Sequence, residues 1–141
     1  MYLDSAYLAK YYVTEPDSAR VRAAIESAET RVSSMWAIGE VVCAFHRHVR
    51  EGHMTPEHCA LLSELFLDHV ASEVWVLTPV TERLLRKTAS LIARAPAAVC
   101  LRTGDAVHLS TAQDLGEREI WSNDRHLLAA APYFGLVGRS A

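Results

Sequence analysis

The chain alternates short apolar segments typical of strands with longer segments of helical periodicity, and this alternation runs from end to end. The strand-like segments are rich in β-branched and aromatic residues and end at polar residues or turn formers. They are MYLD (1–4), TRVSS (30–34), EVWVLTP (73–79), EIWSND (119–124) and LVGR (136–139). The alternation predicts an α/β fold with a central, mostly parallel sheet flanked by helices on both faces.

Several of the expected helices begin at threonines that can act as N-caps. Thr55 precedes Pro56, which suits the first helical position, and Thr81 and Thr103 precede two further helices. In the helix after Thr81, the periodicity predicts an inward-facing stripe. Its members are Leu84, Leu85, Leu91 and Ile92.

Length and composition predict one domain, residues 1–141, without repeats or linkers. The most apolar stretch, 59–77, carries three acids and a histidine, so we do not expect it to span a membrane. No signal peptide is readable, which favours a cytoplasmic protein. The three cysteines are too widely spaced for a zinc pair or a disulfide framework: Cys43, Cys59 and Cys100.

Two acids, Asp4 and Asp124, lie at or just after the ends of expected strands, where parallel sheets collect functional groups. Asp105 lies in the first turn of an expected helix, and Glu40 lies in the first turns of the helix after the second strand, so all four acids could reach one rim of the sheet. Each also has an ordinary explanation. Asp4 can cap a helix, and Asp124 can stabilise a turn. Asp105 can be an acid in the first turn of a helix, where the helix dipole stabilises negative charge. Glu40 can be a solvated helix residue.

The local contexts favour a shared site instead. Every residue within four positions of Glu40 is apolar or glycine, and Asp4 and Asp105 also have apolar neighbours. An isolated carboxylate in such a setting would carry a desolvation cost of several kcal/mol or take up a proton. Converging carboxylates repel one another unless a cation neutralises them, and oxygen ligands suit Mg²⁺ or Mn²⁺. The net charge of −3 argues against a protein that binds nucleic acid through its overall charge, although a bound metal would offset the negative charge locally.

Four sequence blocks resemble the signature blocks of the PIN-domain family, especially its VapC-type toxin ribonucleases. They are YLDSAYLAK, GEVVCAFHR, LRTGDAVHLSTA and SNDRHL, which occur in the family's order from Tyr2 to Leu127. The resemblance implies a parallel-sheet α/β fold and metal-dependent endoribonuclease activity on RNA. It also implies a cognate antitoxin as partner and frequently a homodimer.

The resemblance implies that the four acids form the catalytic and metal-binding set, with Asp4 and Asp105 as the closest ligands. Glu40 and Asp124 would complete the shell or orient water. Supporting polar residues fall on Ser5, Ser122 and Asn123. In the expected mechanism, one or two Mg²⁺ ions (or Mn²⁺) activate a water that attacks the RNA phosphodiester.

Arg102 is the expected substrate contact because it lies three residues before Asp105. His108 follows Asp105 by one helical turn and could touch substrate, but helix packing is the expectation. His46 and His48 do not share a helix face, and His53 and His58 flank a turn, so we expect no metal role for them.

Two other functions fit parts of the pattern. A haloacid-dehalogenase-type Mg²⁺ phosphatase shares an early strand-end aspartate, but its second aspartate would fall on Ala6. A PIN-like module that binds RNA or protein without cutting is the second alternative, and the presence of all four acids argues against it.

Overall fold

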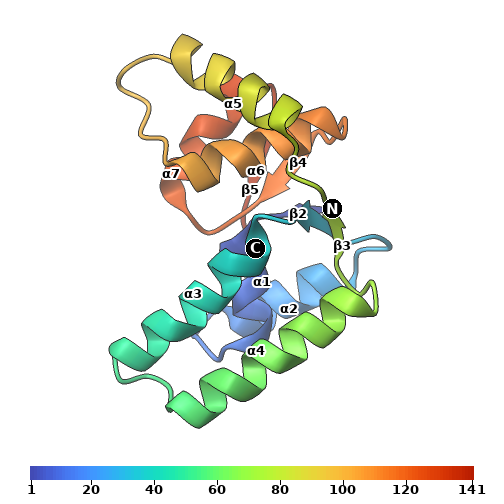
Figure 1. Ribbon diagram of the computed structural model, residues 1–141, viewed down its shortest axis with the longest axis vertical. Coiled ribbons are helices and arrows are strands. Elements are labelled where there is room, and N and C mark those ends of the chain that lie inside the picture. Colours follow the sequence, from blue (N-terminus) through green and yellow to red (C-terminus); the bar gives the residue numbers. More distant parts are fainter.

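Five short strands form one parallel sheet in the computed structural model, which describes residues 1–141 (Figure 1). The strand order is β3-β2-β1-β4-β5, and every neighbouring pair is parallel. The strands are β1 (Tyr2–Leu3), β2 (Val32–Ser34), β3 (Val76–Thr78), β4 (Glu119–Trp121) and β5 (Val137–Arg139). The predicted parallel sheet is confirmed, and each strand lies within a segment that the sequence pattern indicated.

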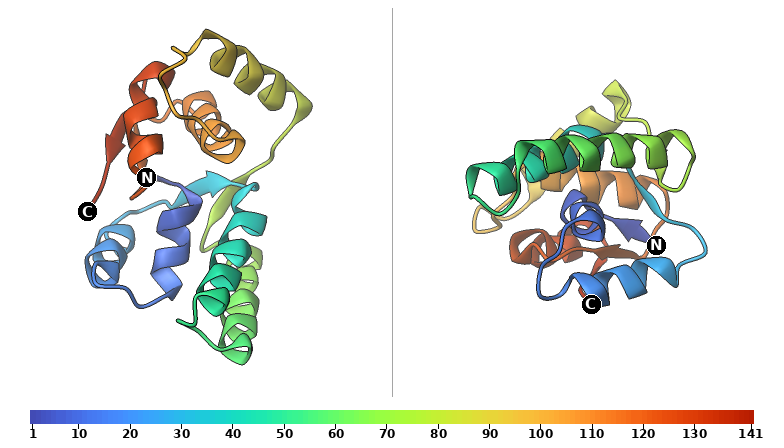
Figure 2. Two further views of the ribbon diagram at one scale, coloured as in Figure 1. Left: turned by 90° about the vertical axis from the view of Figure 1, so that its left-hand side faces the viewer. Right: turned by 90° about the horizontal axis from the view of Figure 1, so that it is seen from below.

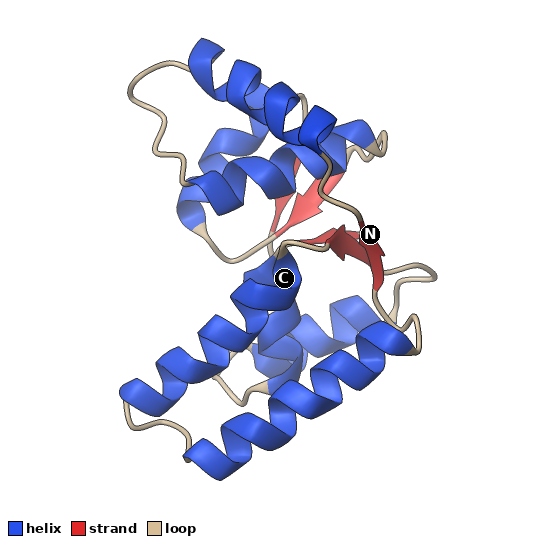
Figure 3. Ribbon diagram, in the orientation of Figure 1, coloured by secondary structure: helices blue, strands red, loops and turns tan.

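Helices cover both faces of this sheet, also as predicted (Figures 1 and 3). One layer contains α1 (Ser5–Tyr12), α2 (Ser18–Glu26), α3 (Ala37–Arg50) and α4 (Pro56–Ala71). The other contains α5 (Glu82–Arg94), α6 (Thr103–Asp114), α7 (Arg125–Ala130) and the 3₁₀ helix η1 (Ala131–Phe134). The left view of Figure 2 shows the same two groups on either side of the strands. None of these helices combines the length and apolar character needed to cross a membrane.

Each helix layer packs its own hydrophobic core against the sheet. The core under α1–α4 contains Phe45, Phe66 and Trp75, and the core under α6 and α7 contains Leu109 and Ile120. The central strand β1 contributes to both, because Leu3 faces the first core and Tyr2 the second. This alternation follows from the two-residue side-chain period of a strand.

The chain leaves β1 and its neighbour β4 toward opposite layers. The helix after β1 is α1, in the first layer, and the helix after β4 is α7, in the second (Figure 1). In open α/β sheets, a crevice forms beyond the carboxyl ends of two such strands. The topology therefore predicts a crevice beyond β1 and β4.

The helix details partly differ from prediction. Thr55 and Thr81 cap α4 and α5 as expected, but α6 begins at Thr103 with Arg102 as its N-cap. The Asp105 carboxylate accepts the Arg102 backbone N–H at 3.3 Å. This bond makes Arg102 the N-cap, so α6 begins one residue earlier than predicted.

The predicted inward stripe on α5 was too wide. Leu85 is 41% exposed and Ile92 is 38% exposed, while Leu84 and Thr88 are buried. The helix lies at the outside of its layer and packs mainly on α6, so only a narrow face is covered.

Candidate functional site

A small polar cavity of about 190 Å³ lies beyond the carboxyl ends of β1 and β4. All four acids line it, although they are widely separated in sequence: Asp4, Glu40, Asp105 and Asp124. Ser5, Arg102, His108 and Arg47 line the same cavity. The fold thus brings together the acids that the sequence analysis singled out.

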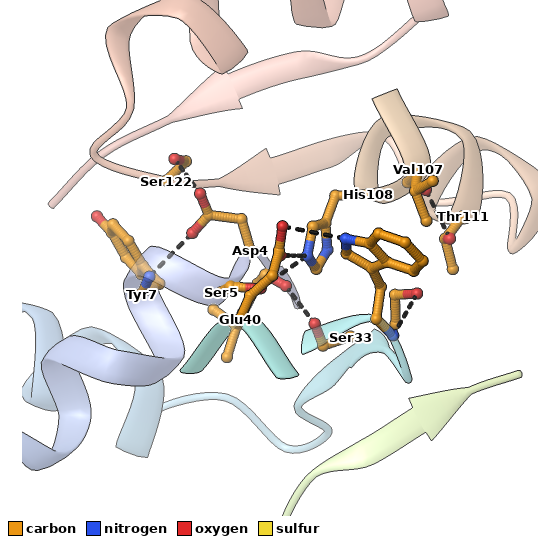
Figure 4. A network of polar contacts seen from close by, with 12 residues as sticks. Asp4, Ser5, Tyr7, Ser33, Glu40, Val107, His108, Thr111 and Ser122 are labelled. Carbon is orange, nitrogen blue, oxygen red and sulfur yellow. Dashed lines mark hydrogen bonds and ion pairs between the residues drawn. The ribbon is translucent and has the colours of Figure 1, made fainter. Parts of the chain in front are cut away.

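Asp4 is the most deeply buried of the four acids, with 4% of its surface exposed. Its Oδ1 accepts the Tyr7 backbone N–H at 2.9 Å, which caps α1, and its Oδ2 accepts the Ser122 hydroxyl at 2.5 Å (Figure 4). Burial raises the pKa of Asp4 to about 6 despite these two hydrogen bonds. Asp4 is therefore both a helix cap and a carboxylate that burial disfavours in its ionised form.

Asp124 and Asp105 each belong to the start of a helix. Asp124 caps α7 by accepting the His126 N–H at 2.7 Å, and its own N–H donates to Ser122 Oγ at 2.8 Å. Asp105 lies in the first turn of α6, where burial, together with the negative charge of Asp124, raises its pKa. Ser122 joins Asp4 to Asp124 through its hydroxyl.

Glu40 is held by three donors from three parts of the chain. The Trp36 indole N–H donates to Oε1 at 3.1 Å, and the Ser5 hydroxyl donates to Oε2 at 2.5 Å. His108 Nε2 lies 3.1 Å from Oε2 (Figure 4). Burial alone would raise the pKa of Glu40, but the bonds from His108 and Ser5 outweigh it and lower that pKa. Glu40 is therefore held as a carboxylate in a fixed position.

His108 has a larger part in this site than helix packing. The ring is only 2% exposed, and its Nδ1 lies 3.1 Å from the Tyr2 hydroxyl. Burial raises the pKa of Tyr2 far above its usual range, so the phenol keeps its proton. His108 Nε2 donates to Glu40, because a carboxylate oxygen can only accept a hydrogen bond, and it also lies 2.8 Å from Ser5 Oγ. The sequence signal was a polar residue one turn after Asp105 in an otherwise apolar run.

Asn123 departs from its expected place, and Arg47 is a cavity residue for which the sequence analysis made no prediction. The Asn123 side chain turns away from the cavity, because it donates to Asp17 Oδ2 at 2.7 Å and accepts from the Ser140 hydroxyl at 2.8 Å. Arg47, by contrast, lines the cavity beside Arg102. It lies two helical turns after Glu40, a spacing that returns a helix to the same face.

The donor set suits a hard divalent cation because every acidic ligand offers oxygen. No three of the four acids bring carboxylate oxygens within 4.8 Å of one another, which fits an ion held partly through water. Burial raises the pKa values of Asp4 and Asp105, and a divalent cation in the cavity would offset their negative charge. The cavity could therefore hold Mg²⁺ or Mn²⁺ between its acids.

Comparison with known proteins identifies the fold and the family. No protein with curated annotation matches the chain by sequence. The crystal structure of Mycobacterium tuberculosis VapC20, described in its title as a sarcin-ricin loop cleaving toxin, superposes with a TM-score of 0.71. The two are 15% identical, and the match covers 92% of this chain and 93% of that one. The family model for the PIN domain matches residues 1–132, so the chain belongs to the PIN domain family.

Proposed function

We propose that the protein is a divalent-metal-dependent endoribonuclease that acts as the toxin of a toxin–antitoxin pair, of the VapC type. The observation that carries the proposal is the convergence of Asp4, Glu40, Asp105 and Asp124 on one cavity of a PIN-domain chain. The phosphatase alternative loses its support, because Ala6 lines the cavity where that chemistry needs a second aspartate.

In this proposal the four acids bind the metal, with Asp4 and Asp105 as the closest ligands. A bound Mg²⁺ or Mn²⁺ would supply a water of lowered pKa and positive charge for the phosphoryl oxygens. Ser122 and the Tyr7 N–H fix the two oxygens of Asp4, and Ser5, Trp36 and His108 fix those of Glu40. These bonds hold the carboxylates in place before substrate arrives.

Arg102 and Arg47 are the cationic side chains of the cavity, and we assign them to the RNA phosphates. A cation beside the acids is needed because the protein carries a net charge of −3. A guanidinium can contact a phosphate through two parallel hydrogen bonds. We therefore place the RNA backbone across the mouth of this cavity.

The first test is whether purified protein cleaves RNA only when a divalent ion is present. Cleavage is expected to disappear in EDTA and to return on addition of excess Mg²⁺ or Mn²⁺, because the acids then regain their counter-charge. Activity that persists in EDTA would contradict the proposal. A non-cutting PIN module would bind the RNA and leave it intact in both conditions.

The likeness to VapC20 makes a sarcin–ricin-loop hairpin the first substrate to try. Transfer RNA and messenger RNA are the comparison substrates in the same assay. Cleavage of all three at the same rate would point to an enzyme without preference for one RNA class.

A toxin of this kind needs a cognate antitoxin, and the PIN-type toxins that it resembles are frequently homodimers. We propose both partners for this protein, acting in the cytoplasm. Expression of the toxin alone is expected to arrest growth, and co-expression of a small adjacent reading frame that encodes the antitoxin is expected to relieve this arrest. Light scattering of the purified protein is expected to give twice the chain mass.

Replacing Gly104 with alanine is expected to lower the cleavage rate by about a hundredfold, because a displaced catalytic group loses its productive geometry. A Cβ at Gly104 would collide with the Glu40 carboxylate and lie 3.2 Å from the Trp36 indole nitrogen. Gly39→Ala is the matched control, since Gly39 lies next to Glu40 and its Cβ would meet nothing within 4 Å. Equal rates for the two variants would show that Glu40 does not need its observed position.

A further inference from the structure

We propose that the turn between α3 and α4 forms a second metal site, specific for Zn²⁺ and separate from the carboxylate cavity. Ligand atoms of His48, Glu51 and His53 all lie within 4.8 Å of one another. His53 Nδ1 is 3.7 Å from a Glu51 oxygen, and the two imidazole centroids are 6.0 Å apart. These side chains belong to the helix end and turn at the lower left of Figure 1.

The backbone of the turn is what brings the two histidines together. Gly52 has φ of +75°, and the N–H groups of Gly52 and His53 donate to the carbonyls of Val49 and His48 at 3.0 and 2.8 Å. This pair of bonds is the Schellman motif, in which the second residue beyond the helix cap contacts a residue in the helix's last turn. That contact is usually between two apolar side chains, but here it joins two imidazoles.

The ligand types select the metal. Two imidazoles with one carboxylate form a usual zinc set, whereas Mg²⁺ prefers oxygen alone. Zinc–ligand bonds of about 2 Å require ligand atoms about 3 to 4 Å apart, somewhat closer than in the metal-free turn. His53 is 66% exposed, so small side-chain rotations can close this gap without moving the backbone.

A fourth ligand is available from the neighbouring loop. Glu15 Oε1 lies 3.5 Å from His48 Nε2, and both residues line a pocket of about 400 Å³ with His53 and His58. Glu15 lies between α1 and α2, so a zinc ion bound to all four residues would fasten that connection to the end of α3. Glu15 also pairs with Lys10 at 3.2 Å, which limits its negative charge before metal binds.

The zinc site and the carboxylate cavity lie at different parts of α3. His48 follows Glu40 by eight residues, which is about 12 Å along a helix. Each site can therefore be filled and measured with the other intact.

The test is a Zn²⁺ titration of the full-length, EDTA-stripped protein in excess Mg²⁺, which keeps the carboxylate cavity supplied with its own ion. We expect one equivalent of zinc to bind, and Co²⁺ in its place to show the visible absorption of a tetrahedral nitrogen–oxygen site. His53→Ala is expected to weaken binding by about a hundredfold, since loss of even an outer partner costs about 10–100-fold. Glu51→Gln, at another exposed ligand, is expected to weaken it as well.

His46→Ala is the matched control, because His46 is an exposed histidine on the same helix that does not belong to the cluster. It is expected to leave zinc affinity and Co²⁺ absorption unchanged. The proposal is overturned if His53→Ala binds zinc as tightly as the natural chain, or if no zinc binds in excess Mg²⁺. Neither readout involves RNA, so the result is independent of the proposed nuclease activity.

Discussion

Replacing Asp4 with asparagine is expected to abolish RNA cleavage and, without divalent ions, to make the protein more stable at neutral pH. Asp4 is buried at the end of β1, and burial raises the pKa of its carboxyl to about 6. Asparagine removes the charge while keeping an oxygen that can accept the Tyr7 N–H. In the proposed function Asp4 is a metal ligand, and losing it would remove several kcal/mol of transition-state stabilisation, which is about a thousandfold in rate.

The gain in stability has a defined pH dependence. The folded protein binds the Asp4 proton more tightly than the unfolded chain, so this stabilising contribution is complete below the ordinary pKa of 3.8. It is lost as the pH rises through about 6, and the whole shift corresponds to about 3 kcal/mol. The natural chain should therefore lose stability relative to Asp4→Asn between about pH 4 and pH 7.

Urea unfolding in EDTA at about pH 4.5 and about pH 7.5 measures this difference, and a cleavage assay in Mg²⁺ measures the loss of activity. Asp68→Asn is the matched control, because Asp68 is exposed and its carboxylate lacks hydrogen-bond partners in the protein. A folded Asp4→Asn protein that still cleaves RNA would rule out the ligand role. Equal stability of the two proteins at about pH 7.5 would contradict the burial argument.

Replacing His108 with leucine is expected to lower both stability and cleavage, through Glu40 and Tyr2. The Tyr2 hydroxyl would lose its partner in a buried position, and Glu40 would lose one of its three donors. A buried polar group left without a partner costs about 1–3 kcal/mol. His108 contacts the Glu40 carboxylate, a metal ligand in the proposed function, so cleavage is expected to fall about 10–100-fold through weaker metal binding.

The Mg²⁺ concentration for half-maximal cleavage separates positioning from general destabilisation. It is expected to rise for His108→Leu and to return toward the natural value for His108→Gln, whose amide can still donate to Glu40. RNA affinity measured without metal is expected to stay unchanged in both. If His108→Leu cleaves with unchanged metal dependence, His108 serves packing alone, as the sequence had suggested.

The sequence predicts the layers of this protein, and the rim where its four acids lie, because both depend on local patterns. Strand-like segments ending in Asp4 and Asp124 identify the rim of a parallel sheet without any knowledge of how the helices pack. The predicted width of the buried face of α5 was wrong. Leu85 and Ile92 are exposed because α5 packs mainly on α6 and no second helix covers them. Periodicity identifies an apolar face, but not how much of it a neighbour covers.

The polar networks were harder to predict because each depends on one precise approach between distant segments. His108 reaches Glu40 across 68 positions of sequence. His48 and His53 meet only because Gly52 adopts a left-handed conformation and reverses the chain. Helical spacing, which assumes that α3 continues, places these two imidazoles apart.

The division of the acids between the two layers bears on how this protein is made. Asp4 and Glu40 belong to the α1–α3 layer, while Asp105 and Asp124 begin α6 and α7 in the other layer. The ribosome must therefore synthesise β4, at residues 119–121, before all four carboxylates can come together beside β1. Under the proposed function, nearly the whole polypeptide is synthesised before the protein can cut the RNA of its own cell.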